Sequence, residues 1–546
     1  MMATGADPRA RTGARGHQRM EARRHGRTAR LARVAALCLC CVCAFVRFAA
    51  AQCPDGTPPP CAARPARAPA SPSNSIAVLY FDNLSRDTSD VYLADGLTEE
   101  IISRLGDLPR LQVKSRGAVR RFRGSTDDPA AIGRALAAAY LVSGGVRRSG
   151  ERLRVDVELT RAATGVRVWG HQYERPVGDL FAIEGDIAQE VTRSVAGQIL
   201  PAERNRLLAA PTRNPAAYDF YLRGNRALWE ATVEGAQQAI VDFEAALRLN
   251  PQFAAARGRI AYAYGWLANW NLTLPGVARD SLVARGLAVA NQALREDSTS
   301  SDAWLGSGML LFYRDPPDYA ASLDALGRAV ALDSTSAAAH QAFGMALRRL
   351  GDFARSEAEY RRAIAVDPGN VHSMADLGVI AFTFRRYAEA LAWYDSALAH
   401  DSRAWFAVMF RAPIRMDLGD TAGARQDAVR LLQFSPASSR PTVEAIAAQI
   451  DALAGDTTAA RARLAPALRD VEGPPGPVEI REGFETALAL VALGERDRAL
   501  AVLARIRPHG AWLWSYLVMP WFDSLRADPR FQALLRESRP PGAVDP

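Results

Sequence analysis

The sequence contains few side chains in the patterns that catalysis needs. Lys114 is the only lysine, which excludes a P-loop, a protein-kinase active site and an S-x-x-K serine hydrolase, because each needs a lysine within its motif. The seven histidines form no H-E-x-x-H pair, and no G-x-S-x-G or G-x-G-x-x-G motif occurs. These residues therefore predict a protein that is not an enzyme and needs no cofactor.

Two groups of polar residues are candidates for a metal or small-ligand site. One contains Asp82, Asp95, Glu99 and Glu100, near a predicted first strand and helix, where open α/β sheets often bind ligands. Because fold-level analogy carries little weight, we expect capping and solvated charge on an exposed helix face instead. The second group is His340 with His372. We expect surface or groove histidines there, and hence no metal site.

All six cysteines lie near the start of the chain. Four fall within an apolar run, whereas Cys53 and Cys61 flank a proline-rich stretch. In an oxidising compartment two such neighbours are expected to form a disulfide. Zinc is the alternative, but two ligands without a nearby histidine are too few.

The first 51 residues have the features of a leader. Ten arginines precede or interrupt an apolar run at 34–46, which is followed by small residues ending at Ala51. A membrane span needs about 20 apolar residues, so this shorter run favours a signal peptide over 1–51, cleaved after Ala51, and export to the periplasm or cell envelope. The alternative is an uncleaved inner-membrane anchor. Translation starting at Met1 or at Met20 stays open.

The charge of the chain is concentrated in this leader. Its arginines and two acidic residues give a balance of +8, which equals the net charge of the whole chain. The remaining residues are therefore neutral overall, and bulk charge does not support nucleic-acid binding. Residues 52–74 are rich in Pro and Ala and predict a linker.

Residues 75–203 alternate between strand and helix patterns. Strands are predicted at 75–84, 111–115, 140–147, 153–160 and 166–173, and helices at 90–105, 129–139 and 177–200. The order β-α-β-α-β-β-β-α predicts a small mixed sheet covered by helices, an α+β domain.

These residues resemble the TolB amino-terminal-like domain, which is related to FlgO and CsgG of the bacterial envelope. The resemblance rests on segments 76–85, 92–100, 145–148, 163–169 and 181–188, with Tyr80 in place of the usual Pro. Family members often join this domain to tetratricopeptide repeats, behind a membrane segment and a cytoplasmic kinase, cyclase or DNA-binding domain. We expect no such effector here, because only 33 residues precede the apolar run.

Two successive units of 34 residues, 337–370 and 371–404, follow each other without a gap. Matching residues recur at unit positions 7, 8, 20, 24, 27 and 32: Phe343, Gly344, Ser356, Tyr360, Ala363 and Pro368, then Leu377, Gly378, Ala390, Tyr394, Ala397 and Ser402. Small residues let paired helices approach closely, and Pro ends a helix. The pattern resembles the tetratricopeptide repeat, a superhelix of helix pairs.

Weaker copies of this pattern extend the all-α array. We expect a connector at 204–213, tetratricopeptide repeats over 214–508, and a C-terminal cap and tail at 509–546.

In this architecture the first helix of each unit lines the concave surface. In the units over 337–438, we expect the inward positions of these helices to face solvent and form a peptide groove. Together with the neighbouring Arg349, the groove candidates are Gln341, Met345, Arg348, Arg349, His372, Val379, Phe382, Phe406, Met409 and Met416. Exposed Phe and Met indicate an interaction site, and the two arginines are expected to pair with a carboxylate of the bound segment. The alternative is that these residues pack against a neighbouring loop.

The sequence thus predicts a non-catalytic envelope protein whose repeats bind a protein or peptide partner. The first alternative is a membrane-tethered sensor or regulatory protein whose α/β domain binds a small ligand. A hydrolase with an unrecognised site is disfavoured by the missing motifs. Membrane association through the N-terminal segment, the identity of the partner and the oligomeric state stay open.

Overall fold

The computed structural model describes residues 72–546, apart from 209–211, 271, 436–438, 474–479 and 507–509. The predicted leader, most of the linker and the Cys53–Cys61 disulfide lie outside the described residues. Ala70–Pro546 forms one compact unit. Within the described part of the chain, no helix has both the length and the apolar character that a membrane span requires.

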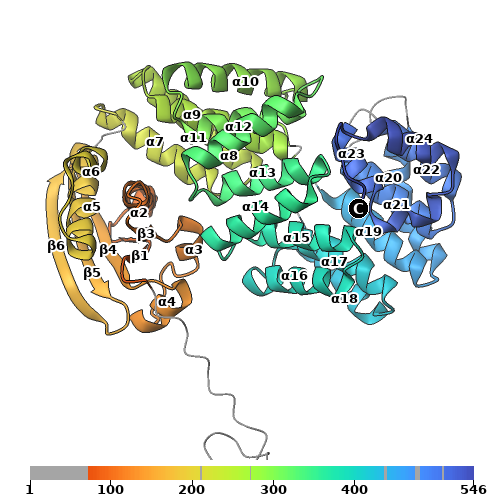
Figure 1. The fold of residues 1–546 in the computed structure, drawn as a ribbon, viewed down its shortest axis with the longest axis horizontal. Coiled ribbons are helices and arrows are strands. Elements are labelled where there is room, and N and C mark those ends of the chain that lie inside the picture. Colours follow the sequence, from red (N-terminus) through yellow and green to blue (C-terminus); the bar gives the residue numbers. More distant parts are fainter. Residues whose placement is uncertain (1–71, 209–211, 271, 436–438, 474–479, 507–509) are drawn as a thin grey trace, which may run out of the picture. The chain divides into compact units, whose positions relative to one another are not determined.

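A mixed sheet opens this unit (Figure 1). Its strands run in the order β3-β1-β4-β5-β6, and a short β2 pairs with β4 outside this order. β1 is parallel to β3 and β4, whereas β4, β5 and β6 are antiparallel. The bounds are β1 Ser75–Val78, β2 Asp82–Asn83, β3 Gln112–Val113, β4 Tyr140–Ser149, β5 Arg152–Arg161 and β6 Val166–Pro176.

The mixed sheet predicted from the sequence is confirmed, but its first strand is divided. The N–H of Phe81 donates to Thr98 Oγ1 of a helix at 3.0 Å instead of to a neighbouring strand. The predicted strand at 75–84 therefore becomes β1 and β2.

Helices cover both faces of the sheet. On one face, α2 (Val91–Gly106) and α5 (Leu180–Ala196) bury Leu97 and Ile187 against Ile76. On the other, α3 (Arg116–Arg120) and α4 (Pro129–Leu136) bury Leu136 against Ala77. Successive residues of β1 thus enter two different cores, which explains why this strand is apolar throughout.

The rest of the chain is helical, and consecutive helices pack in pairs (Figure 1). Two short 3-10 helices, η1 Thr88–Asp90 and η2 Val177–Asp179, precede α2 and α5. The remaining bounds are α6 Pro201–Leu207, α7 Pro215–Leu228, α8 Val233–Leu249, α9 Ala254–Asn269, α10 Arg279–Glu296, α11 Ser301–Tyr313, α12 Tyr319–Leu332, α13 Ala337–Arg349, α14 Phe353–Val366, α15 Val371–Thr383, α16 Tyr387–His400, α17 Trp405–Asp417, α18 Thr421–Phe434, α19 Arg440–Leu453, α20 Thr457–Val471, α21 Ile480–Ala492, α22 Arg496–Arg505, α23 Gly510–Leu517, η5 Pro520–Leu525 and α24 Pro529–Ser538.

Small residues set the spacing within these pairs. Ser356 Oγ on α14 donates to the carbonyl of Gly344 on α13 at 2.7 Å. Ser322 Oγ on α12 makes the same bond to Gly308 on α11, also at 2.7 Å. A serine on the second helix and a glycine on the first thus make the same contact in two pairs, although the two residues are 12 apart in one pair and 14 apart in the other.

Most turns within the later pairs pass through a left-handed glycine. Gly351, Gly419, Gly455 and Gly494 have φ between 78° and 86°. Arg385 takes this position between α15 and α16, with φ of 58°. Glycine adopts such angles freely, whereas the Cβ of an arginine makes them unfavourable.

We predict that Gly344→Leu and Gly378→Leu each lower the free energy of unfolding by about 1–3 kcal/mol through overpacking. A Cβ at Gly378 would lie 2.6 Å from the ring of Tyr394, and one at Gly344 would lie 3.0 Å from the ring of Tyr360. Gly327→Leu is the control, because the nearest atom to a Cβ there is 3.8 Å away. Equal denaturant midpoints for all three variants would contradict the packing.

Candidate functional site

The structure divides the ten predicted groove residues into two sets. Gln341, His372, Phe406 and Met416 are half-buried. The other six are buried, so the expectation that they face solvent is wrong for them: Met345, Arg348, Arg349, Val379, Phe382 and Met409. Whether a partner reaches any of the ten stays a prediction.

The last helices of the chain cover much of the buried set. Met345 shares a core with Trp514 of α23 and with Val518, the residue that follows this helix. The ring of Phe382 lies 4.5 Å from that of Trp521 in η5, and the guanidinium of Arg349 lies 4.4 Å from the ring of Trp512. These side chains are therefore buried because a later part of the same chain packs against them.

Arg348 has a carboxylate partner within the array. Its Nη2 lies 3.3 Å from Oδ1 of Asp376 on α15, and both side chains are largely buried. Burial raises the pKa of Asp376, and the nearby Arg348 opposes that rise. The positive charge expected to hold a bound carboxylate is thus paired between α13 and α15.

An accessible aromatic patch remains on three helices that are distant in sequence. It consists of Trp270 after α9, His372 on α15 and Phe406 on α17, all half-buried. The His372 ring stacks on Phe406 with centroids 4.1 Å apart and lies 4.7 Å from Trp270. Burial lowers the pKa of His372 to about 4, so the patch is uncharged at neutral pH. The sequence identified His372 and Phe406 but not Trp270, because Trp270 follows α9 in one of the weaker copies of the repeat.

The two histidines weighed as metal ligands have different neighbours. His340 Nδ1 lies 2.6 Å from Oε2 of Glu359, whereas His372 belongs to the aromatic patch. Within the described residues, no group of three or more His, Cys, Asp or Glu side chains is placed to hold a metal.

The acidic group near the first strand is largely paired instead of solvated. Asp95 pairs with Arg226 of α7 at 3.2 Å and also with Arg123. Glu99 lies 3.5 Å from Arg116. The expectation of solvated charge on an exposed helix is therefore wrong for these two, because α7 and the segment containing α3 pack beside α2. Asp82 is exposed.

A buried polar network joins α2 and α5, which cover the sheet, to α7. Arg104 of α2 contacts Glu100 at 3.0 Å and Glu184 of α5 at 3.2 Å. It also donates to the carbonyl of Leu207 at 2.6 Å. The Tyr218 hydroxyl of α7 donates to Glu184 at 2.8 Å. Helices α2 and α5 of the α/β domain, α6 at the start of the connector and α7 thus share a single polar network.

Comparisons with known proteins agree with the helix pairs. Residues 342–407 match the family described as tetratricopeptide repeat, so the chain carries repeats of this family. A curated relative from Rhizobium meliloti (strain 1021), "Putative adenylate cyclase 3", is 30% identical over 245 residues, which cover 44% of this chain and 40% of the relative. The chain therefore matches less than half of that protein's length.

Several solved structures are similar to parts of the chain. MamA is 20% identical and covers 33% of this chain and 94% of its own, with a TM-score of 0.25. Pseudomonas aeruginosa pilF is 14% identical, with coverage of 44% and 98% and a TM-score of 0.33. PilW, titled a type IV pilus biogenesis factor, is 17% identical, with coverage of 40% and 96% and a TM-score of 0.32.

Glu184 is predicted to make stability depend on pH. Burial raises the pKa of its carboxyl well above 4.5, and the neighbouring Glu100 raises it further. A pKa raised by folding contributes stability below the unfolded-state pKa that is lost as pH rises through the folded-state pKa. We therefore expect stability to fall as pH rises from about 5 through the folded-state pKa of Glu184, and Glu184→Gln to flatten that fall.

Denaturant midpoints across this pH range test the expectation, with the exposed Glu151→Gln as the control. Burial also raises the pKa of Glu99 to about 7, so the variant should reduce the pH slope without abolishing it. Equal slopes for Glu184→Gln and the unmodified protein would contradict the assignment.

Proposed function

We propose that this protein is a non-catalytic scaffold whose tetratricopeptide repeats bind a protein or peptide partner. The observation that supports it most is the match of 342–407 to the repeat family within a longer series of packed helix pairs. Such arrays present extended surfaces made of successive units, and their known mode of action is recognition of other chains.

The aromatic patch is the proposed place of contact. Trp270, His372 and Phe406 are accessible, uncharged at neutral pH and contributed by three units. Aromatic side chains dominate binding energy at many interfaces because they bury a large rigid area. Gln341 and Met416 are half-buried positions that would extend the contact. The six buried groove residues would hold this surface in place without touching the partner.

The setting that we propose is the bacterial envelope. An arginine-rich start, a short apolar run and small residues up to Ala51 favour export to the periplasm, and the resemblance of 75–203 to the TolB amino-terminal-like domain favours the same compartment. An uncleaved leader would instead tether the protein to the inner membrane.

A sensor is the second candidate function. The buried cluster around Arg104 links α2 and α5 to the first repeat helix, so a ligand bound by the α/β domain would act on the array through it. The name of the curated relative, a putative adenylate cyclase, favours a regulatory role for the shared part. A ligand-induced rise in melting temperature that Glu184→Gln abolishes would support this candidate over a plain scaffold.

In-cell crosslinking of the full chain, followed by mass spectrometry of captured proteins, tests the scaffold proposal. We expect Phe406→Ser to reduce capture of the partner severalfold with little change in melting temperature, because its ring is half-buried. Phe434→Ser, at a position 37% exposed on α18, is the matched control and should capture normally.

Phe382→Ser separates packing from binding. Its ring is fully buried against Trp521, so we expect a loss of about 3–5 kcal/mol of stability. Undiminished capture by the Phe406→Ser variant would show that the aromatic patch is not the contact with the partner. An unchanged melting temperature in Phe382→Ser would contradict the burial of Phe382 beneath Trp521.

A further inference from the structure

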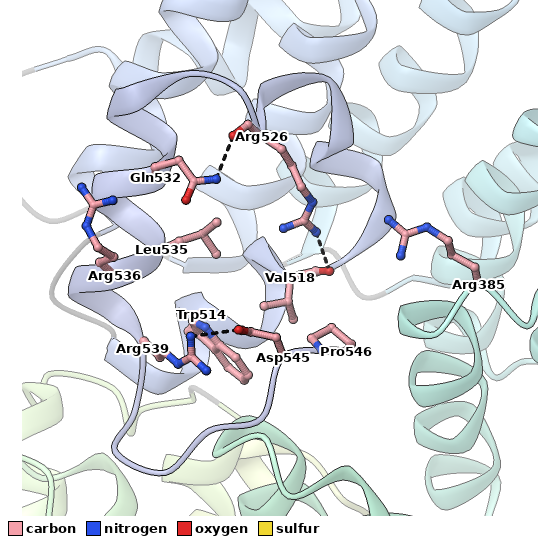
Figure 2. Close-up of a pocket in the computed structure, with 10 residues that line it drawn as sticks. All are labelled: Arg385, Trp514, Val518, Arg526, Gln532, Leu535, Arg536, Arg539, Asp545 and Pro546. Carbon is pink, nitrogen blue, oxygen red and sulfur yellow. Dashed lines mark hydrogen bonds and ion pairs between the residues drawn. The ribbon is translucent and has the colours of Figure 1, made fainter.

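The last helices and the turn between α15 and α16 enclose a pocket of about 380 Å³ (Figure 2). Trp514 contributes an apolar wall to this pocket. Four arginines also line it: Arg385, Arg526, Arg536 and Arg539. Pockets of this volume suit small molecules, and guanidinium groups bind carboxylate and phosphate oxygens well because they donate in pairs.

Positive charge exceeds negative charge around this pocket. Arg385 and Arg526 share the carboxylate of Asp523, at 2.7 Å and 2.9 Å. Arg539 donates to Asp545 at 2.9 Å. Arg536 is exposed and has no carboxylate partner among the residues that the structure describes. Four guanidinium groups therefore face two side-chain carboxylates, an arrangement that favours an added anion.

Arg385 reaches the pocket from an unfavourable backbone position. It has φ of 58° in the turn where the equivalent residue of the next unit, Gly419, has φ of 84°. A non-glycine residue held in this conformation indicates that its side chain serves another purpose. The side chain extends from the array toward the last helices, on the side of the pocket where Arg526 lies (Figure 2).

Asp545 shows how the pocket accepts an oxyanion. Its carboxylate reaches into the pocket and binds Arg539, but the side chain is 65% exposed. The segment around it is held by Ala543, which packs with Trp514 in a buried cluster. Asp545 can thus leave its arginine while Ala543 keeps its packing.

We propose that this pocket binds a small, multiply charged oxyanion carrying phosphate or carboxylate groups. Arg536 and Arg539 bind the anion, Arg385 adds charge from the array, and Asp545 is an internal competitor that the anion displaces. This inference does not rest on partner binding by the aromatic patch, because the two sites share no residue.

Isothermal titration of the full chain with pyrophosphate and with citrate, at low salt and neutral pH, tests the proposal. We expect one of them or both to bind, with pyrophosphate alone indicating a phosphate ligand and citrate alone a carboxylate ligand. Arg536→Gln should weaken binding about three- to tenfold, and Asp545→Asn should tighten it by a similar factor.

Two further variants complete the design. Arg425→Gln removes an exposed charge on α18 and should leave the affinity unchanged. Arg385→Gly restores the residue type of the other turns, so it should weaken binding without lowering the melting temperature. The proposal would be overturned if neither pyrophosphate nor citrate bound. Equal affinities in Arg536→Gln, Asp545→Asn and Arg425→Gln would also overturn it.

Discussion

The indole ring of Trp521 packs against several helices in the second half of the array and holds them together. Its centroid lies 4.5 Å from Phe382 of α15, 6.1 Å from Phe410 of α17 and 6.4 Å from Phe484 of α21. One side chain of η5 therefore meets the first helices of three repeat pairs. Because those helices can contact one ring only if the array curves around it, this packing fixes the curvature and leaves part of the inner face covered.

The first half of the array is restrained by the α/β domain. Asp95 pairs with Arg226 of α7, and Glu184 accepts a hydrogen bond from the Tyr218 hydroxyl of the same helix. Farther along the chain, Ser115 Oγ before α3 donates to the carbonyl of Val366, the last residue of α14, at 2.8 Å. Contacts at α7 and again beside α14 brace the intervening pairs, which favours a rigid surface over a flexible one.

Local sequence was sufficient to predict the helices and strands, but not the contacts between elements that are far apart in the chain. Repeated small residues such as Gly344 and Ser356 predicted the helix pairs because their close contact is local. The burial of Phe382 depends on Trp521, and the pairing of Asp95 on Arg226, both more than 100 residues away in sequence. The repeat pattern predicted that Phe382 faces solvent in a groove, but it carries no information on the later helix that buries this ring.

Hydroxyl-radical footprinting of the intact protein tests that central point most directly, because it measures the solvent accessibility of individual side chains. Phe382 and Trp514 are almost fully buried, whereas Phe384 is 40% exposed. We predict that Phe382 and Trp514 are oxidised far more slowly than Phe384, at rates close to that of the buried Phe484. Oxidation of Phe382 and Trp514 at the rate of Phe384 would contradict the account, since it would mean that the last helices do not cover the array.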